Sequence, residues 1–150
     1  MKEKKMLEQV KKFEQINRKM DSLYHEESAL AGVPDCTGMI LYALLMADSP
    51  ITQKEICEEI SMPKQTVNSA LKKLENEGII EFSHKDDRRY KDIHLTEKGK
   101  KFSENTAGVL IQTLSKAFSS LTDTEQNEFL SLYEKLAINF EEEISRQHTG

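Results

Sequence analysis

Residues 52–95 constrain the fold most strongly, because helical and extended patterns follow one another within this short span. A helix is predicted to begin at Thr52, which has Glu55 three residues later, the spacing of an N-terminal capping box. Residues 61–63 form a tight turn, since their proline is tolerated in the first turn of a helix but not deeper. A second helix therefore follows the first almost immediately.

Two strand-like runs come after this second helix. Gly78 is placed to end the helix in a left-handed conformation. Residues 79–82 and 90–95 are rich in apolar and aromatic side chains and flank a charged loop, a pattern typical of a hairpin. The order helix, turn, helix and hairpin predicts a winged helix-turn-helix, in which the second helix can enter the major groove of duplex DNA.

The rest of the chain is predicted to be helical. Residues 3–30, and the segments from Thr96 and from Thr122 onward, carry apolar stripes at helical spacing, and an apolar run after a predicted N-cap at Asp35 indicates a buried central helix. The predicted fold class is mainly α with a small β-hairpin wing (α+β). It comprises a winged helix-turn-helix DNA-binding domain at 36–98, flanked by a helical dimerisation region at 1–35 and 99–147. Dimerisation is expected because the small core cannot cover three apolar stripes, and twofold symmetry is the commonest oligomeric form.

Charge is distributed unevenly along the chain. The net charge is −5, yet residues 61–101 contain ten Lys or Arg against seven Asp or Glu. The positive surplus therefore lies in the segment expected to face phosphates. No apolar run approaches the ~20 residues of a membrane span. The Lys-rich start lacks the apolar part of a secretory signal, so we expect a cytoplasmic protein with reduced thiols and no membrane partner.

The predicted second helix has an inward face of Val67, Ala70, Leu71 and Leu74. Its other side carries side chains suited to base edges and phosphates, because Gln and Asn can bond adenine bidentately and Lys can bond guanine or phosphate. The predicted DNA-binding residues of this helix are Lys64, Gln65, Thr66, Asn68, Ser69 and Lys72.

The loop between the predicted strands supplies a second predicted contact. Arg88 and Arg89 are placed where the tip of a wing meets the minor groove, whose negative potential attracts arginine. Asp86 and Asp87 are unfavourable beside a polyanion, so one of them is expected to pair with an arginine and stiffen the loop.

Two other interpretations of this segment remain open. The polar helix face and the charged loop are also compatible with ordinary solvated surface. A winged-helix module that binds protein and never DNA is the alternative function, which salt dependence of binding would distinguish.

The chain resembles the MarR (multiple antibiotic resistance regulator) family of winged helix-turn-helix repressors. The resemblance rests on TQKEI, KQTVNSALKKLENEG, Asp87-Arg88-Arg89 and Leu95-Thr96-Glu97-Lys98-Gly99. The family's wing pattern is Asp-x-Arg, a short strand and Leu-Thr-x-x-Gly, which assigns the wing-stabilising role to Asp87. The resemblance implies a homodimer on a pseudo-palindromic operator, acting as a repressor in the family's manner and released by a small molecule or by thiol oxidation.

Control by an effector is expected where the dimerisation helices meet the winged core, near Cys36, Met39, Ile40 and Tyr42. Cys36 is a possible sensor, because the dipole of a helix N-terminus lowers a thiol pKa. Oxidant-sensing members of the family often carry their cysteine in the first helix, which Cys36 does not match.

Other chemistry is not indicated by the sequence. His25 with neighbouring acids lacks the tight spacing of a zinc site, so no metal is predicted. No phosphate-binding glycine loop, nucleophile motif or paired-carboxylate pattern occurs, so we expect neither an enzyme nor a cofactor.

Overall fold

The computed structural model describes residues 1–84 and 91–150, which fall into two compact units, Met1–Ile111 and Gln112–Gly150. The described elements in chain order are α1 (Lys2–Ala31), α2 (Asp35–Met46), β1 (Ile51–Thr52), α3 (Gln53–Glu59), α4 (Lys64–Asn76), β2 (Ile80–His84), β3 (Lys91–Leu95), α5 (Glu97–Glu104), α6 (Ala107–Ser119) and α7 (Asp123–Thr149). This is the predicted class: mainly helical, with a small antiparallel sheet.

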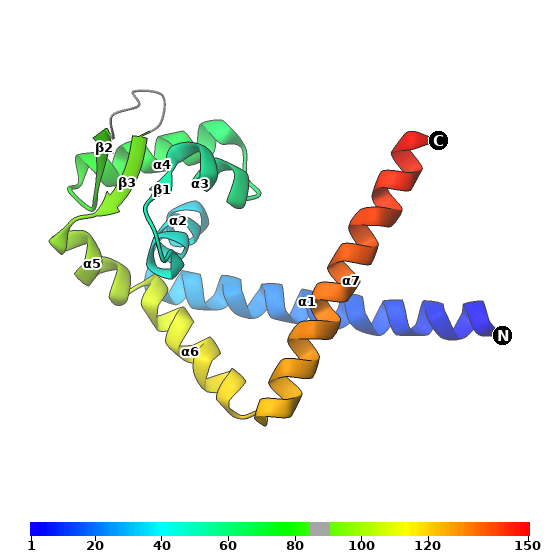
Figure 1. Cartoon of the computed structure of the whole chain (residues 1–150). Coiled ribbons are helices and arrows are strands. Elements are labelled where there is room, and N and C mark those ends of the chain that lie inside the picture. Colours follow the sequence, from blue (N-terminus) through cyan, green and yellow to red (C-terminus); the bar gives the residue numbers. More distant parts are fainter. Residues whose placement is uncertain (85–90) are drawn as a thin grey trace. The chain divides into compact units, whose positions relative to one another are not determined.

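The core of the first unit forms around α2, the helix predicted to be buried and central. Ile40 and Leu41 of α2 are fully buried together with Ile56 of α3 and with Val67 and Leu71 of α4. Figure 1 shows α3, α4 and the strands grouped around α2. Burying each such side chain stabilises the fold by about 1.5–3 kcal/mol. This cluster therefore holds the second motif helix firmly against the core.

The sheet has the strand order β1-β3-β2, with both pairs antiparallel. Strands β2 and β3 form the predicted hairpin, in which Phe82 lies opposite Ile93. Strand β1 pairs with the other edge of β3, where Ile51 lies opposite Ile93. The sequence did not predict β1, because two residues are too few to show an alternating pattern.

The predicted helix ends are present where side chains or glycines determine them. Thr52 Oγ1 accepts a hydrogen bond from the Glu55 amide (3.2 Å), and the Thr52 amide donates to Glu55 Oε2 (2.8 Å), completing the capping box. Thr122 and Glu125 form a second capping box at the start of α7. Gly78 has the left-handed conformation that was predicted, with φ of +72°.

Two predicted helix boundaries are wrong. Helix α2 already includes Asp35, and its N-cap is Pro34, which caps with no side-chain hydrogen bond. The single helix predicted from Thr96 onward is instead α5 and α6, separated at Asn105 and Thr106. The Thr106 hydroxyl donates to the Phe102 carbonyl (2.8 Å), the local back-bonding that bends helices.

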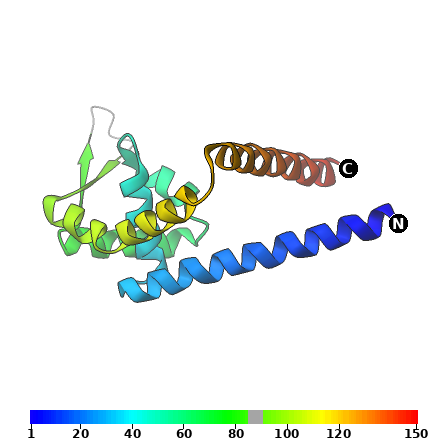
Figure 2. The same ribbon diagram turned by 90° about the horizontal axis from the view of Figure 1, so that it is seen from below.

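Helices α1 and α7 have no buried residue. Figure 2 shows each of them as one unbroken helix. Met6 of α1 keeps 63% of its surface exposed, and Leu132 and Phe140 of α7 keep 66% and 65%. Within the second unit, the Phe129 ring stacks on Tyr133 with centroids 5.5 Å apart. Most of the apolar surface of both helices is therefore left uncovered by the described residues of the single chain.

Candidate nucleic-acid interface

Helix α4 divides into a buried and a polar face as the sequence predicted. Its hydrophobic side chains Val67, Leu71 and Leu74 are buried. The predicted contact residues Lys64, Gln65, Thr66, Ser69 and Lys72 are exposed, and Asn68 is half-buried. All of these except Thr66 line one shallow hollow on the outer surface of the helix. The structure thus gathers five of the six predicted side chains on a single patch, the α4 patch (Lys64, Gln65, Asn68, Ser69 and Lys72).

Asn68 has partners that the sequence did not reveal. Its Oδ1 accepts a hydrogen bond from Gln53 Nε2 of α3 (2.8 Å) and one from Cys57 Sγ (3.7 Å). Both lone pairs of this oxygen are then engaged, whereas bidentate bonding to adenine needs the amide oxygen as well as the amide nitrogen. The structure therefore leaves Asn68 Nδ2 as the group that can reach outward, as a donor.

Helix α4 is tied to a neighbouring helix at its C-terminal end. At its start, the Val67 amide makes an ordinary intrahelical hydrogen bond to the carbonyl of the N-cap, Pro63 (3.1 Å). At its end, the Ile79 amide donates to the Leu74 carbonyl (2.9 Å), and Lys98 Nζ of α5 donates to the Glu77 carbonyl (2.7 Å). A cation beside free carbonyls at a helix C-terminus is favourable electrostatically. The α4 patch is thus carried by a helix whose inner face is buried in the core and whose C-terminal end is bonded to α5.

The base of the wing is described, but its tip is not. Asp87, Arg88 and Arg89 lie outside the described residues. In the hairpin below them, Ser83 Oγ and His94 Nε2 are 2.6 Å apart across the two strands. Lys91 Nζ lies 5.7 Å from the centroid of the Phe82 ring, a cation–π contact. These cross-strand contacts hold the two strands that lead to the tip.

Cys36 differs from its predicted chemistry. It lies at the start of α2 as expected, but only 6% of it is exposed. Burial, with a smaller contribution from Cys57, raises the pKa of the Cys36 thiol above its ordinary value of 9.0. The expectation of a lowered pKa is wrong, because burial of the thiol disfavours its charged form.

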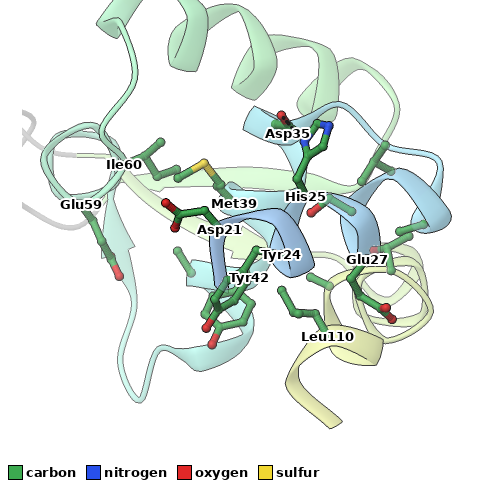
Figure 3. A pocket seen from close by; sticks show the side chains of 17 residues that line it. Asp21, Tyr24, His25, Glu27, Asp35, Met39, Tyr42, Glu59, Ile60 and Leu110 are labelled. Atoms are coloured by element: carbon green, nitrogen blue, oxygen red, sulfur yellow. Dashed lines mark ion pairs between the residues drawn. The ribbon is translucent and has the colours of Figure 1, made fainter. Parts of the chain in front are cut away.

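A cavity of about 460 Å³ lies where α1 meets α2, the end of α3 and the start of α6. Figure 3 shows its labelled side chains, including Met39 and Tyr42, which belong to the region predicted for effector control. Cys36 and Ile40 of that region belong to the buried core instead. At its edge, His25 Nδ1 lies 3.3 Å from Asp35 Oδ2. In the described part of the chain, no group of three or more His, Cys, Asp or Glu side chains is arranged to hold a metal ion.

No single helix in the described ranges is long and apolar enough to cross a membrane. Helices α1 and α2 pass such a test only when taken together across a bend of 96°.

The helix-turn-helix, the antiparallel hairpin and the exposed polar face of α4 define a winged helix-turn-helix protein. Residues 31–89 match the MarR family. The HTH-type transcriptional regulator YwhA of Bacillus subtilis (strain 168), itself uncharacterized, is 33% identical over 106 residues, which cover 70% of this chain and 76% of that protein. The chain belongs to the MarR family. It is accordingly a transcriptional regulator and not an enzyme, as the sequence predicted.

Solved structures agree with this assignment. NMB1585, a MarR family regulator from Neisseria meningitidis, is 26% identical with a TM-score of 0.70, and the match covers 91% of this chain and 98% of that one. A MepR–DNA complex from S. aureus has a TM-score of 0.65 at 20% identity, covering 85% of this chain and 93% of that one. At that identity the second likeness shows the fold alone.

Proposed function

We propose that this regulator binds double-stranded DNA as a homodimer, with α4 in the major groove and the wing over the adjacent minor groove. The observation that carries the proposal is the α4 patch, a gathering of polar and basic side chains on the outer face of a helix anchored by its opposite face. The MepR–DNA complex, which shares the fold, is consistent with it. Lys64 and Lys72 bind phosphate or guanine, and Gln65, Thr66 and Ser69 contact base edges or the backbone.

In this proposal Asn68 makes a single hydrogen bond to a base and does not bind adenine bidentately. With its oxygen held by Gln53, its Nδ2 donates to an acceptor on a base edge, such as O4 of thymine or N7 of a purine. The wing completes the interface: Arg88 and Arg89 enter the minor groove and Asp87 stabilises the loop, as the family pattern implies.

The dimer is proposed to form through residues 1–35 and 99–147, with 36–98 as the DNA-binding domain. The support is the exposed apolar surface of α1 and α7, two long helices without a buried residue. Contiguous apolar surface of this kind marks an interface. A twofold dimer places its two α4 helices on half-sites about 34–36 Å apart, which accounts for a pseudo-palindromic operator. Sedimentation of a chain truncated after Ser120 tests this, because a soluble monomer that still binds DNA would contradict it.

The regulator is proposed to act as a cytoplasmic repressor that a signal releases from DNA. The cavity between α1 and α2 favours a small-molecule signal, since a ligand there contacts both the helix proposed for dimerisation and the core that carries α4. The second candidate is oxidation of Cys36, although its burial and raised pKa make the thiol less reactive. Oxidant treatment of wild type and Cys36→Ser distinguishes the two, because equal responses exclude this thiol as the sensor.

DNA binding is tested by affinity selection from a random-sequence duplex pool, followed by titration of the selected duplex at several salt concentrations. Affinity should fall steeply with salt, because bound phosphates release counterions. Lys72→Ala should lower the salt slope by about one. Lys73→Ala is the matched control and should leave the slope unchanged, because Lys73 neighbours Lys72 in α4 but pairs with Glu77 (4.0 Å) and lies outside the α4 patch. No duplex retention, or binding that is flat with salt, would support the protein-interaction module instead.

A further inference from the structure

The walls of the cavity between α1 and α2 suit an apolar molecule of drug-like size. Its volume of about 460 Å³ is within the usual range of about 300–1,000 Å³ for small-molecule sites. Met39 and Ile60 contribute apolar surface, and Tyr24 and Tyr42 contribute aromatic rings. Figure 3 shows the two tyrosines on the same side of the cavity as Leu110, away from Asp35. An aromatic or branched apolar body would find contacts on several sides.

The charged side chains of the cavity are almost all acidic. Asp21 and Glu27 come from α1, Asp35 from α2 and Glu59 from α3. Figure 3 shows these four carboxylates at different edges of the cavity, with the His25 ring beside Asp35. The described residues of the lining include neither lysine nor arginine. Four carboxylates from three helices thus surround an apolar space with one imidazole as their only basic neighbour in this lining.

Such a lining should bind positively charged ligands in preference to negatively charged ones. The carboxylates create a negative potential that repels organic anions and attracts cations, and tyrosine rings attract a cation to their faces. A metal ion does not fit equally well, because the acids are spread around the edges and form no cluster that could ligate one in the described part of the chain. The favoured ligand is therefore a large cation whose positive charge is spread over many atoms.

We propose that this cavity binds an organic cation with an apolar, aromatic body, and that such a cation is the signal that releases the regulator from DNA. The proposal deepens the function proposed above and rests on it for the release step, whereas binding of the cation depends only on the cavity.

The test uses two probes of nearly equal size and shape and opposite charge, tetraphenylphosphonium and tetraphenylborate. Each is titrated into the full chain without DNA, by calorimetry and by the emission of the tyrosines. A partly exposed ion pair changes affinity by about 1.5- to 5-fold. Because of the four carboxylates, the affinity for tetraphenylphosphonium should exceed that for tetraphenylborate by roughly tenfold or more. Equal binding of both probes, tighter binding of tetraphenylborate, or binding of neither overturns the proposal.

Charge-neutral variants locate the site. The triple variant Asp21→Asn, Glu27→Gln and Glu59→Gln should lose roughly tenfold in affinity for tetraphenylphosphonium and most of its preference over tetraphenylborate. Glu58→Gln is the matched control, because Glu58 neighbours Glu59 in α3 but pairs with Lys54 (3.8 Å) and does not line the cavity. Its affinity should equal that of wild type. The control removes one charge and the triple variant three. A control loss of about one third of the triple variant's loss, in binding free energy, would therefore mean that whole-chain charge, not the cavity, attracts the probe.

The release step is measured separately on the selected duplex. Tetraphenylphosphonium should weaken DNA binding of wild type at least about tenfold and of the triple variant much less. Cation binding without any DNA binding would support the cavity and contradict the proposed function. DNA binding that the bound cation leaves unchanged would keep the DNA-binding function and overturn the cation as the signal.

Discussion

Gly99→Ala should destabilise the protein, although helix propensity alone predicts the opposite. Gly99 is buried in the first turn of α5, and alanine is favoured over glycine in a helix by about 1 kcal/mol. The structure leaves no room for the added methyl group. A Cβ built on Gly99 would overlap the carbonyl oxygen of Ile79 and lie 2.9 Å from its carbonyl carbon. Because the obstacle is backbone, it cannot move away by changing a rotamer.

The Ile79 carbonyl is held in place by the contacts that join α4 to the wing. It accepts a hydrogen bond from the Thr96 amide (3.1 Å), while the Thr96 hydroxyl donates to the Gly78 carbonyl (2.5 Å). Relieving the overlap would break these bonds or displace α5. Overpacking costs about 1–3 kcal/mol when side chains can adjust, and more when they cannot. We therefore expect a loss of about 3 kcal/mol or more, which lowers Tm by roughly 6–12 °C for a chain of this size.

Thermal and urea unfolding at one fixed protein concentration measure this effect, with Gly38→Ala as the control. A Cβ on Gly38 in α2 would meet Val33 Cγ2 at 3.7 Å and Ser28 Oγ at 3.8 Å, which are ordinary contacts. Gly38→Ala should therefore stabilise the protein by about 0.5–1 kcal/mol. If Gly99→Ala were as stable as wild type, the close approach of Ile79 to α5 would be refuted.

Three further outcomes are expected. Thr52→Ala should reduce the free energy of unfolding by about 1 kcal/mol, because the capping box is lost, and urea titration would contradict this if the midpoint did not move. Gln53→Ala should free one lone pair of the Asn68 oxygen, the other staying with Cys57, and so broaden base preference at one operator position while leaving the salt slope unchanged. A changed slope with unchanged base preference would assign Gln53 to a phosphate contact instead. Well below pH 9.0 the Cys36 thiol is protonated in both the folded and the unfolded chain, so its ionisation does not affect stability. Above pH 9.0 the unfolded chain ionises first, because the folded pKa is raised. The free energy of unfolding should therefore fall as pH rises through the folded pKa. Urea titrations at pH about 8 and about 10 should show a smaller alkaline loss for Cys36→Ala than for wild type.

Local signals in the sequence were sufficient for most of the fold. The Thr52 capping box, the helix start at Thr122 and Gly78 with its positive φ lie where they were predicted, since each depends on side chains within three residues or on one backbone angle. Long-range pairing was less visible. Strand β1 exists because Ile51 meets β3 more than forty residues later, and the division between α5 and α6 depends on the buried Thr106 hydroxyl. Neither feature leaves a periodic signal in its own segment.

In the candidate site, too, the sequence predicted which residues face outward but not which of their atoms are free to bind. Helical periodicity correctly separated the buried Val67 and Leu71 from the outward Lys64 and Lys72, because an α-helix repeats every 3.6 residues whatever surrounds it. Periodicity does not state which polar atoms stay available once the preceding helix packs alongside. Asn68 lies at the edge of the patch, close enough to α3 for its oxygen to be bonded there. If α4 enters the major groove as proposed, its base preference should therefore depend on Gln53 of the neighbouring helix as well as on the residues of α4 itself.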